Sequence, residues 1–139
     1  MRVRKGLLVG ALVMAASAGA AEQASPYGTW RTPERGGLIE VSQCDGGLCG
    51  KILGGTGSSP EDRFDRNNKN PALRSRQLIG LYVFRGLKPA GGSWKGSIYN
   101  PSDGGTYSAT VTLKSASEMT VKGCVVWPLC KTQVWAKVK

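Results

Sequence analysis

The chain has 139 residues, with 19 Lys and Arg against 9 Asp and Glu, no His, 4 Cys and 20 Gly. At this length one domain is expected. The absence of His removes the commonest general base and the commonest metal ligand, so most familiar catalytic and metal centres are excluded.

The N-terminus has the three parts of a secretory signal peptide. Residues 2–5 carry three basic side chains, residues 6–16 are uncharged and largely apolar, and residues 18–20 are small enough for a signal peptidase. The apolar run is shorter than the roughly 20 residues of a membrane-spanning helix. We therefore expect cleavage after Ala20 and an exported product, residues 21–139, that is periplasmic or secreted and has no transmembrane segment.

The exported product remains basic. Removal of the leader leaves 16 basic and 9 acidic residues, a net charge of +7. Such a charge attracts anionic envelope components, such as lipid headgroups or acidic polysaccharide, and salt weakens the attraction. Because the basic residues are spread along the chain, simple solubility is the competing interpretation, and nucleic acid is not an expected partner outside the cell.

The four cysteines predict two disulfides in a short exported chain. Cys44 and Cys49 flank the turn sequence Asp45-Gly46-Gly47, and Cys124 and Cys130 flank five residues in a similar way. Both spacings favour local bridges, Cys44–Cys49 and Cys124–Cys130, across hairpins. A four-Cys zinc site is disfavoured by these spacings, and a reactive thiol has no His to activate it.

Short strands follow one another along the chain. In order, they are predicted over residues 27–32, 37–44, 48–53, 78–87, 94–99, 106–113, 119–125 and 133–138. Residues 54–70 have the composition of a long irregular loop, and a short helical turn is expected around residues 72–76. In the clearest strand, residues 106–113, apolar side chains alternate with Thr and Ser.

About eight antiparallel strands with no long helical pattern indicate an all-β fold. We predict a small up-and-down β-barrel, because closure of the sheet removes its exposed edges. Eight strands enclose an interior that side chains fill or that holds one small ligand. An open sandwich is the alternative.

The order of these features resembles a bacterial family of exported proteins catalogued as domain of unknown function 2147. The resemblance covers nearly all of residues 21–139. The motifs that carry it are Gly28-Thr29-Trp30, the Cys44/Cys49 hairpin with Gly50-Lys51-Ile52, residues 70–76 with Leu78-Ile79-Gly80-Leu81, Trp94-Lys95-Gly96 with residues 98–101, Asp103-Gly104 with Thr106-Tyr107, and Gly123-Cys124 with residues 130–135.

This resemblance implies a small lipocalin-like (calycin-like) β-barrel in the bacterial envelope with no established activity. Gly28 and Trp30 are also similar to the entry-strand motif of lipocalins, where the Trp plugs the closed end. The sequence departs from the family pattern at Lys131, where Arg is expected, and at residues 125–128, where a Gly-rich bend is usual.

Several polar and aromatic residues are candidates for ligand or surface contacts, and each has a structural alternative. Asp65 and Asn67 could join Asp62 around a calcium ion, but the Arg residues beside them favour a solvated turn, and we expect no metal. Arg74 and Arg76 could bind a carboxylate or phosphate group, or could pair with Asp62 or Asp65.

The tryptophans are the other candidates. Trp30, Trp94 and Trp135 could line a pocket for an apolar ligand or fill the core. Trp127 lies beside Pro128 inside the loop closed by Cys124 and Cys130. There it is expected to be exposed and could contact a membrane or carbohydrate surface.

No nucleophile or nucleotide-binding motif is present, so we expect no enzyme and no cofactor. A hydrolase that uses carboxylates such as Glu40 and Asp65 is the remaining catalytic alternative. The predicted function is an exported binding protein for a small apolar or anionic ligand or an envelope component. The alternative is a structural or protein-interaction domain with a solid core that acts through its long loop and basic surface.

Overall fold

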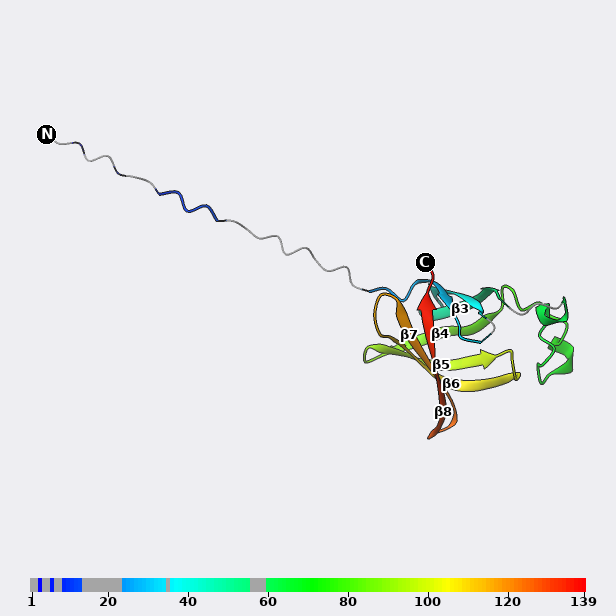
Figure 1. Cartoon of the computed structure of the whole chain (residues 1–139). Helices are drawn as coiled ribbons and strands as arrows, with labels where there is room; N and C mark the ends of the chain where they lie inside the picture. The colour runs from blue at the N-terminus through cyan, green and yellow to red at the C-terminus, as the bar shows by residue number, and fades with distance from the viewer. Residues whose placement is uncertain (1–2, 4–5, 7–8, 14–23, 35, 56–59) are drawn as a thin grey trace.

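The computed structural model describes residues 3, 6, 9–13, 24–34, 36–55 and 60–139, and its strands form one closed antiparallel barrel (Figure 1). Each strand pairs with its neighbour in the sequence, and β1 pairs with β8 to close the sheet. The strands are β1 (Gly28–Arg31), β2 (Leu38–Cys44), β3 (Gly47–Gly54), β4 (Tyr82–Ala90), β5 (Ser93–Asn100), β6 (Gly105–Leu113), β7 (Glu118–Val126) and β8 (Leu129–Lys137). The predicted eight-stranded barrel is confirmed, whereas the expected cleavage site after Ala20 lies outside the described residues.

Two predicted strands begin elsewhere, since β8 starts at Leu129 instead of residue 133 and β4 starts late. The apolar run at residues 78–87 was expected to be extended throughout, but β4 begins only at Tyr82. Leu78 to Leu81 form a turn instead, closed by a hydrogen bond from the Leu81 N–H to the Leu78 carbonyl (2.9 Å). Gly80 makes this turn possible, because its φ of +90° is a conformation that side chains rarely adopt.

The long β3–β4 connection contains two short 3₁₀ turns, η1 (Pro60–Arg63) and η2 (Pro71–Leu73). The side chain of Asn70 accepts a hydrogen bond from the Ala72 N–H and so caps η2, in place of the helical turn expected at residues 72–76. No helix within the described ranges is long and apolar enough to cross a membrane.

Two tight turns close one end of the barrel. Asp45 and Gly46, between β2 and β3, have φ values of 52° and 70°, and Gly91 and Gly92, between β4 and β5, have φ values of 58° and 85°. Consecutive positive φ values match the right-handed twist of the strands that such two-residue turns join. The β6–β7 connection lies at the same end, and the β1–β2, β3–β4, β5–β6 and β7–β8 connections lie at the opposite end, because neighbouring strands are antiparallel.

The half of the barrel nearest the tight turns is packed with apolar side chains. Trp30, which has no exposed surface, lies in this cluster, and its indole N–H donates to the Pro26 carbonyl (2.8 Å). Gly50 lies opposite Phe84 in the ladder between β3 and β4, where a Cβ atom would approach the Phe84 ring to 2.5 Å. The other members of the cluster in this half include Val41, Leu48, Leu87, Val111 and Met119.

Both predicted disulfides are confirmed. Cys44 is joined to Cys49 beside the β2–β3 turn, and Cys124 is joined to Cys130 at the base of the β7–β8 turn. Each bridge fixes one hairpin, at opposite ends of the barrel.

Candidate functional site

A pocket of about 550 Å³ occupies the half of the barrel away from the tight turns. Strand alternation produces its wall, because every second side chain of a strand points into the barrel. The wall is largely apolar, and its residues come from strands β2 to β8, from the β3–β4 loop and from the β1–β2 and β5–β6 connections. They include Ile39, Ile52, Phe64, Leu78, Val83, Ile98, Val121 and Trp135.

Trp135 forms part of the inner end of the pocket. Its ring is stacked on Phe84 with centroids 6.1 Å apart, and it is only 3% exposed. Phe84 in turn belongs to the buried core cluster. Trp135 therefore borders both the pocket and the buried core.

Glycines keep the pocket open at two places on its wall. A Cβ atom at Gly123 would meet the Tyr107 and Ile98 side chains at 3.6 and 3.8 Å, which are ordinary contacts, and a Cβ atom at Gly54 would meet nothing within 4 Å. Neither residue has a positive φ. Both positions could therefore carry a side chain. Because Gly54 and Gly123 have none, space remains at the pocket wall.

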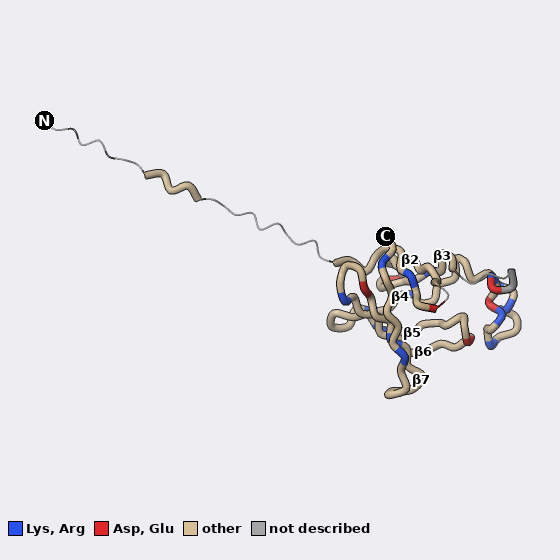
Figure 2. The backbone as a smooth tube through the Cα atoms, in the orientation of Figure 1, with Lys and Arg blue, Asp and Glu red and all other residues tan. Residues whose placement is uncertain are grey.

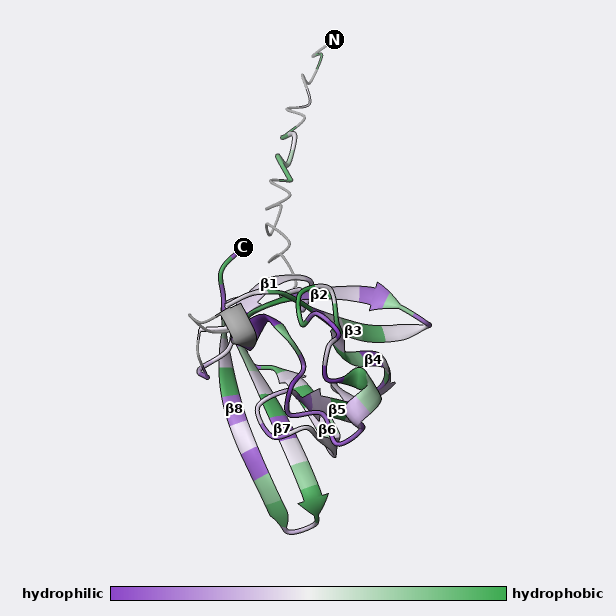
Figure 3. Ribbon diagram, turned by 90° about the vertical axis from the view of Figure 1, so that its right-hand side faces the viewer, coloured by the Kyte–Doolittle hydropathy of each residue, from purple (hydrophilic) through white to green (hydrophobic). Residues whose placement is uncertain are grey.

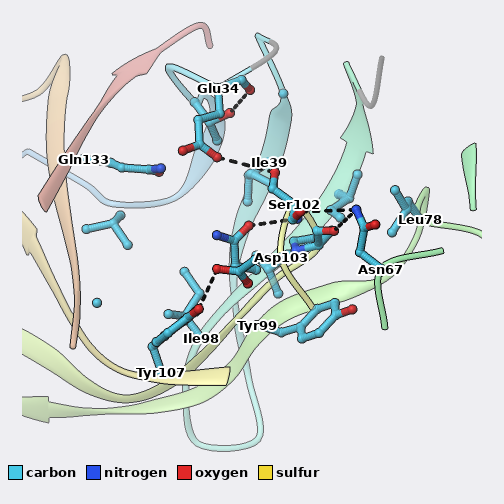
Figure 4. Close-up of a pocket in the computed structure, with 18 of the residues that line it drawn as sticks. Glu34, Ile39, Asn67, Leu78, Ile98, Tyr99, Ser102, Asp103, Tyr107 and Gln133 are labelled. Atoms are coloured by element: carbon cyan, nitrogen blue, oxygen red, sulfur yellow. Dashed lines mark hydrogen bonds between the residues drawn. The ribbon is translucent and has the colours of Figure 1, made fainter. Parts of the chain in front are cut away.

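Gln133 is a polar group well placed to bind a ligand. Its Oε1 accepts a hydrogen bond from the Trp135 indole N–H (3.1 Å), and because an indole nitrogen only donates, this contact fixes which amide atom is oxygen. Figure 4 shows the amide nitrogen directed into the pocket. No described residue accepts a hydrogen bond from this nitrogen, so it is available to a ligand.

The charged groups at the mouth are paired with one another. The Lys131 ammonium on β8 lies 2.7 Å from Glu34 in the β1–β2 connection, and Ser102 in the β5–β6 turn donates to the same carboxylate (3.4 Å). The hydrogen bond and charge of Glu34 raise the pKa of Lys131. The β1–β2 connection, the β5–β6 turn and the start of β8 therefore meet across the mouth, and Figure 4 shows Glu34 facing Ser102 there.

Asp103 and Asp62 are paired as well. Asp103 accepts hydrogen bonds from the Tyr107 hydroxyl and the Gly105 N–H (2.7 Å), and the pKa of Tyr107 is raised by the bond to Asp103. Asp62 lies 3.6 Å from Arg66. Every acidic group that lines the pocket among the described residues thus has a partner in the protein.

The β3–β4 loop is held against the barrel by a buried carboxylate. Asp65, 1% exposed, accepts from the Tyr99 hydroxyl (2.5 Å), the Asn68 amide (2.9 Å) and the Arg76 guanidinium (2.8 Å). Burial and the bond to Asp65 raise the pKa of Tyr99 to about 12. This network anchors the loop to β5, and Figure 1 shows the loop beside the β5–β6 turn.

The loop also touches that turn through Asn67. Its side-chain amide donates to the Pro101 and Ser102 carbonyls, each at 3.2 Å. A Cβ atom at Gly104 would lie 1.9 Å from the Asn67 carbonyl oxygen, so the two backbones could not approach this closely with any other residue there. The contact places Asn67 at the pocket mouth.

The structure separates the residues proposed from the sequence. Trp135 and Asn67 line the pocket, whereas Trp30 lies in the packed core outside it. Asp65 and Arg76 form an ion pair with each other, which was the structural alternative to ligand binding. Arg74 donates to the Asn68 carbonyl (2.8 Å), and Trp127 lies at an exposed hairpin tip.

The two carboxylates considered for hydrolysis lie in different surroundings. Glu40, on β2, lies across from Lys51 on β3, at 3.8 Å from its ammonium, and Asp65 is held in the loop network. The sequence reasoning missed Gln133 and the Glu34–Lys131 pair. The sequence could have indicated Gln133, because strand alternation places residue 133 on the same face as Trp135.

A closed eight-stranded barrel with an apolar pocket at one end defines a lipocalin-like protein. Residues 28–137 match the family model described as "Uncharacterized protein conserved in bacteria (DUF2147)", and the chain belongs to this family. Among solved structures, it is similar to one described as "Protein HP1028 from the human pathogen Helicobacter pylori belongs to the lipocalin family", with 26% identity, 84% of each chain covered and a TM-score of 0.73. Comparison with curated proteins gives no match.

Proposed function

We propose that this chain is a non-enzymatic binding protein that holds a neutral, mostly apolar small molecule in the barrel pocket. The observation that carries the proposal is an apolar wall combined with a mouth whose acidic groups are already paired. A pocket of about 550 Å³ lies within the range that small-molecule sites occupy.

The wall favours an apolar ligand body. Apolar side chains such as Ile39, Ile98 and Val121 face the pocket, and their contact with a ligand would remove apolar surface from water on both sides. The Gln133 amide nitrogen adds one directional donor, which suits a carbonyl, ether or hydroxyl oxygen of the ligand.

The mouth favours a neutral head group over an anionic one. A carboxylate or phosphate would have to compete with Glu34 for Lys131 or with Asp62 for Arg66, and a buried charge without a partner is costly. Of the two candidates for anion binding, Arg76 is paired with Asp65, and Arg74 donates through its Nε to the Asn68 carbonyl.

A location outside the cytoplasm is supported by the basic leader with its apolar run and by the two disulfides, which persist in oxidising compartments. The chain has no His to serve as a general base, which supports binding over catalysis. The similarity to a solved structure described as a lipocalin also supports ligand binding. We propose no cofactor.

The experiment is a binding titration with the neutral fluorescent probe N-phenyl-1-naphthylamine, comparing the natural chain with Gly123→Leu. The leucine has ordinary contacts at its Cβ and extends into the pocket. We expect saturable binding to the natural chain and an affinity at least tenfold lower for Gly123→Leu, because the side chain occupies ligand volume.

Ser97→Leu is the matched control. Ser97 is exposed and precedes Ile98 on β5, so the same leucine is added outside the barrel, and probe affinity should not change.

Displacement of the probe by oleyl alcohol should be stronger than displacement by oleate, which has a charged head on a similar chain. Absence of saturable binding, or equal affinity in Gly123→Leu, would overturn the proposal, and stronger displacement by oleate would overturn the neutral head group.

A further inference from the structure

The β7–β8 turn presents an apolar tip. Val125, Val126, Trp127 and Leu129 are between 67% and 77% exposed, although large apolar side chains are usually covered. We call these four residues, with Pro128, the apolar tip. Figure 3 shows the hairpin extending beyond the rest of the barrel, with hydrophobic colouring at its end.

The apolar tip is continuous with the pocket. Val125 and Leu129 belong to the pocket lining, whereas Val126 and Trp127 do not. Apolar surface therefore runs from the end of the hairpin into the barrel. A lipophilic molecule could follow this surface without crossing open water.

The charge of the β7–β8 hairpin is one-sided beyond Glu118, the first residue of β7, which lies at the end of the strand far from the tip. Residues 119–139 contain four Lys and no Asp or Glu. Lys131 lies two residues after Leu129, and Lys122 lies three residues before Val125, which at about 3.3 Å per residue places them roughly 7 and 10 Å along the strands from the tip. Figure 2 shows basic and no acidic residues along this part of the hairpin.

These dimensions correspond to those of a bilayer surface. A headgroup layer is about 5–8 Å thick, so a tip inserted at the acyl boundary would place both lysines at the level of the headgroups or just above them. Lys131 is also bonded to Glu34, whereas Lys122 has no acidic partner among the described residues. Trp is the residue type that prefers this interface, because its ring is apolar and its N–H is polar.

We propose that the apolar tip inserts into the surface of an anionic lipid membrane and directs the pocket mouth toward it. A stable protein partner generally covers about 800 Å² per side, far more than one narrow turn offers, whereas a lipid surface accepts a small convex tip. The Cys124–Cys130 bridge closes the base of the turn, so the tip is held in place before it meets the membrane. The proposal goes beyond ligand binding, and it gives the proposed ligand a route between bilayer and barrel.

The test is co-sedimentation with vesicles of phosphatidylethanolamine and phosphatidylglycerol, and with vesicles of phosphatidylcholine alone. The natural chain should bind the anionic vesicles more tightly, with salt weakening the binding. The double variant Val126→Ser with Trp127→Ser should bind at least tenfold less. Val134→Ser, a change of one half-exposed apolar residue on β8 away from the tip, is the control and should bind as the natural chain does.

The failures of the two proposals are distinguishable. Val126 and Trp127 do not line the pocket, so the double variant should keep its affinity for N-phenyl-1-naphthylamine, which also shows that it is folded. Vesicle binding without probe binding would leave the tip proposal standing and remove the ligand proposal. The tip proposal is overturned if the natural chain binds neither vesicle, if the double variant binds equally well, or if the natural chain forms dimers that the double variant does not form.

Discussion

The two halves of the barrel are built from the same eight strands and differ in what fills them. Near the tight turns, Trp30, Leu48 and Met119 are almost completely buried. Toward the other end, Gly54 and Gly123 stand where side chains would fit, and the apolar wall faces a cavity. The packed half supplies stability, and the open half is where a ligand can bind.

The largest expected difference between the halves is in the cost of truncating a side chain. Trp30→Ala removes a large, fully buried ring and should lower the free energy of unfolding by about 3–5 kcal/mol. Ile98→Ala shortens a half-buried side chain that already borders the pocket, and should cost about 1 kcal/mol. Urea unfolding of both variants measures the loss in the free energy of unfolding. Equal losses for Trp30→Ala and Ile98→Ala would mean that the pocket is not open in solution.

The loop that borders the mouth should depend on its buried carboxylate. Arg76→Ala leaves Asp65 without its cation, and because the Arg76 side chain is 35% exposed we expect a loss of about 2 kcal/mol, less than for a fully buried pair. Arg74→Ala is the matched control, since Arg74 bonds only to a backbone carbonyl in the same loop, and it should cost about 0.5–1 kcal/mol.

Amide hydrogen exchange shows which part of the chain Arg76→Ala destabilises. Faster exchange in residues 62–78 of Arg76→Ala, with the strands unchanged, is the expected pattern. If Arg74→Ala loosens the loop as much as Arg76→Ala, Asp65 is not what anchors it.

A smaller effect should appear at high pH. The pKa of Tyr99 is raised from 10.0 to about 12, so this tyrosine ionises in the unfolded chain before it ionises in the barrel. Its contribution to stability is therefore complete below about pH 10 and is lost as the pH rises toward about 12. Unfolding titrations should show that Tyr99→Phe loses less stability than the natural chain over this interval. Parallel pH profiles would contradict the assignment.

Much of the fold follows from local patterns. Alternation in β6, the turn at Asp45-Gly46 and the cysteine spacings depend on neighbouring residues alone, and the sequence predicted all of them. The start of β4 was predicted wrongly because hydrophobicity does not distinguish an extended strand from an apolar turn that covers a cavity. Gly80 was the local signal against a continuous strand.

The site was predictable only in part. Asp65 and Arg76 lie 11 residues apart in one loop, and their pairing was among the predicted alternatives. Glu34 and Lys131 are 97 residues apart and meet only because β1 closes on β8. The distinction between Trp30 in the core and Trp135 at the pocket likewise depends on barrel closure, which no local pattern contains.

The central claim is that the open half holds a neutral lipophilic molecule, and native mass spectrometry of protein recovered gently from its own cell envelope tests it most directly. The natural chain should carry a stoichiometric extra mass that denaturation releases as an uncharged, mostly apolar compound. Gly123→Leu, recovered in the same way, should carry none. A bare mass for the natural chain, or the same bound compound on both chains, would contradict the claim.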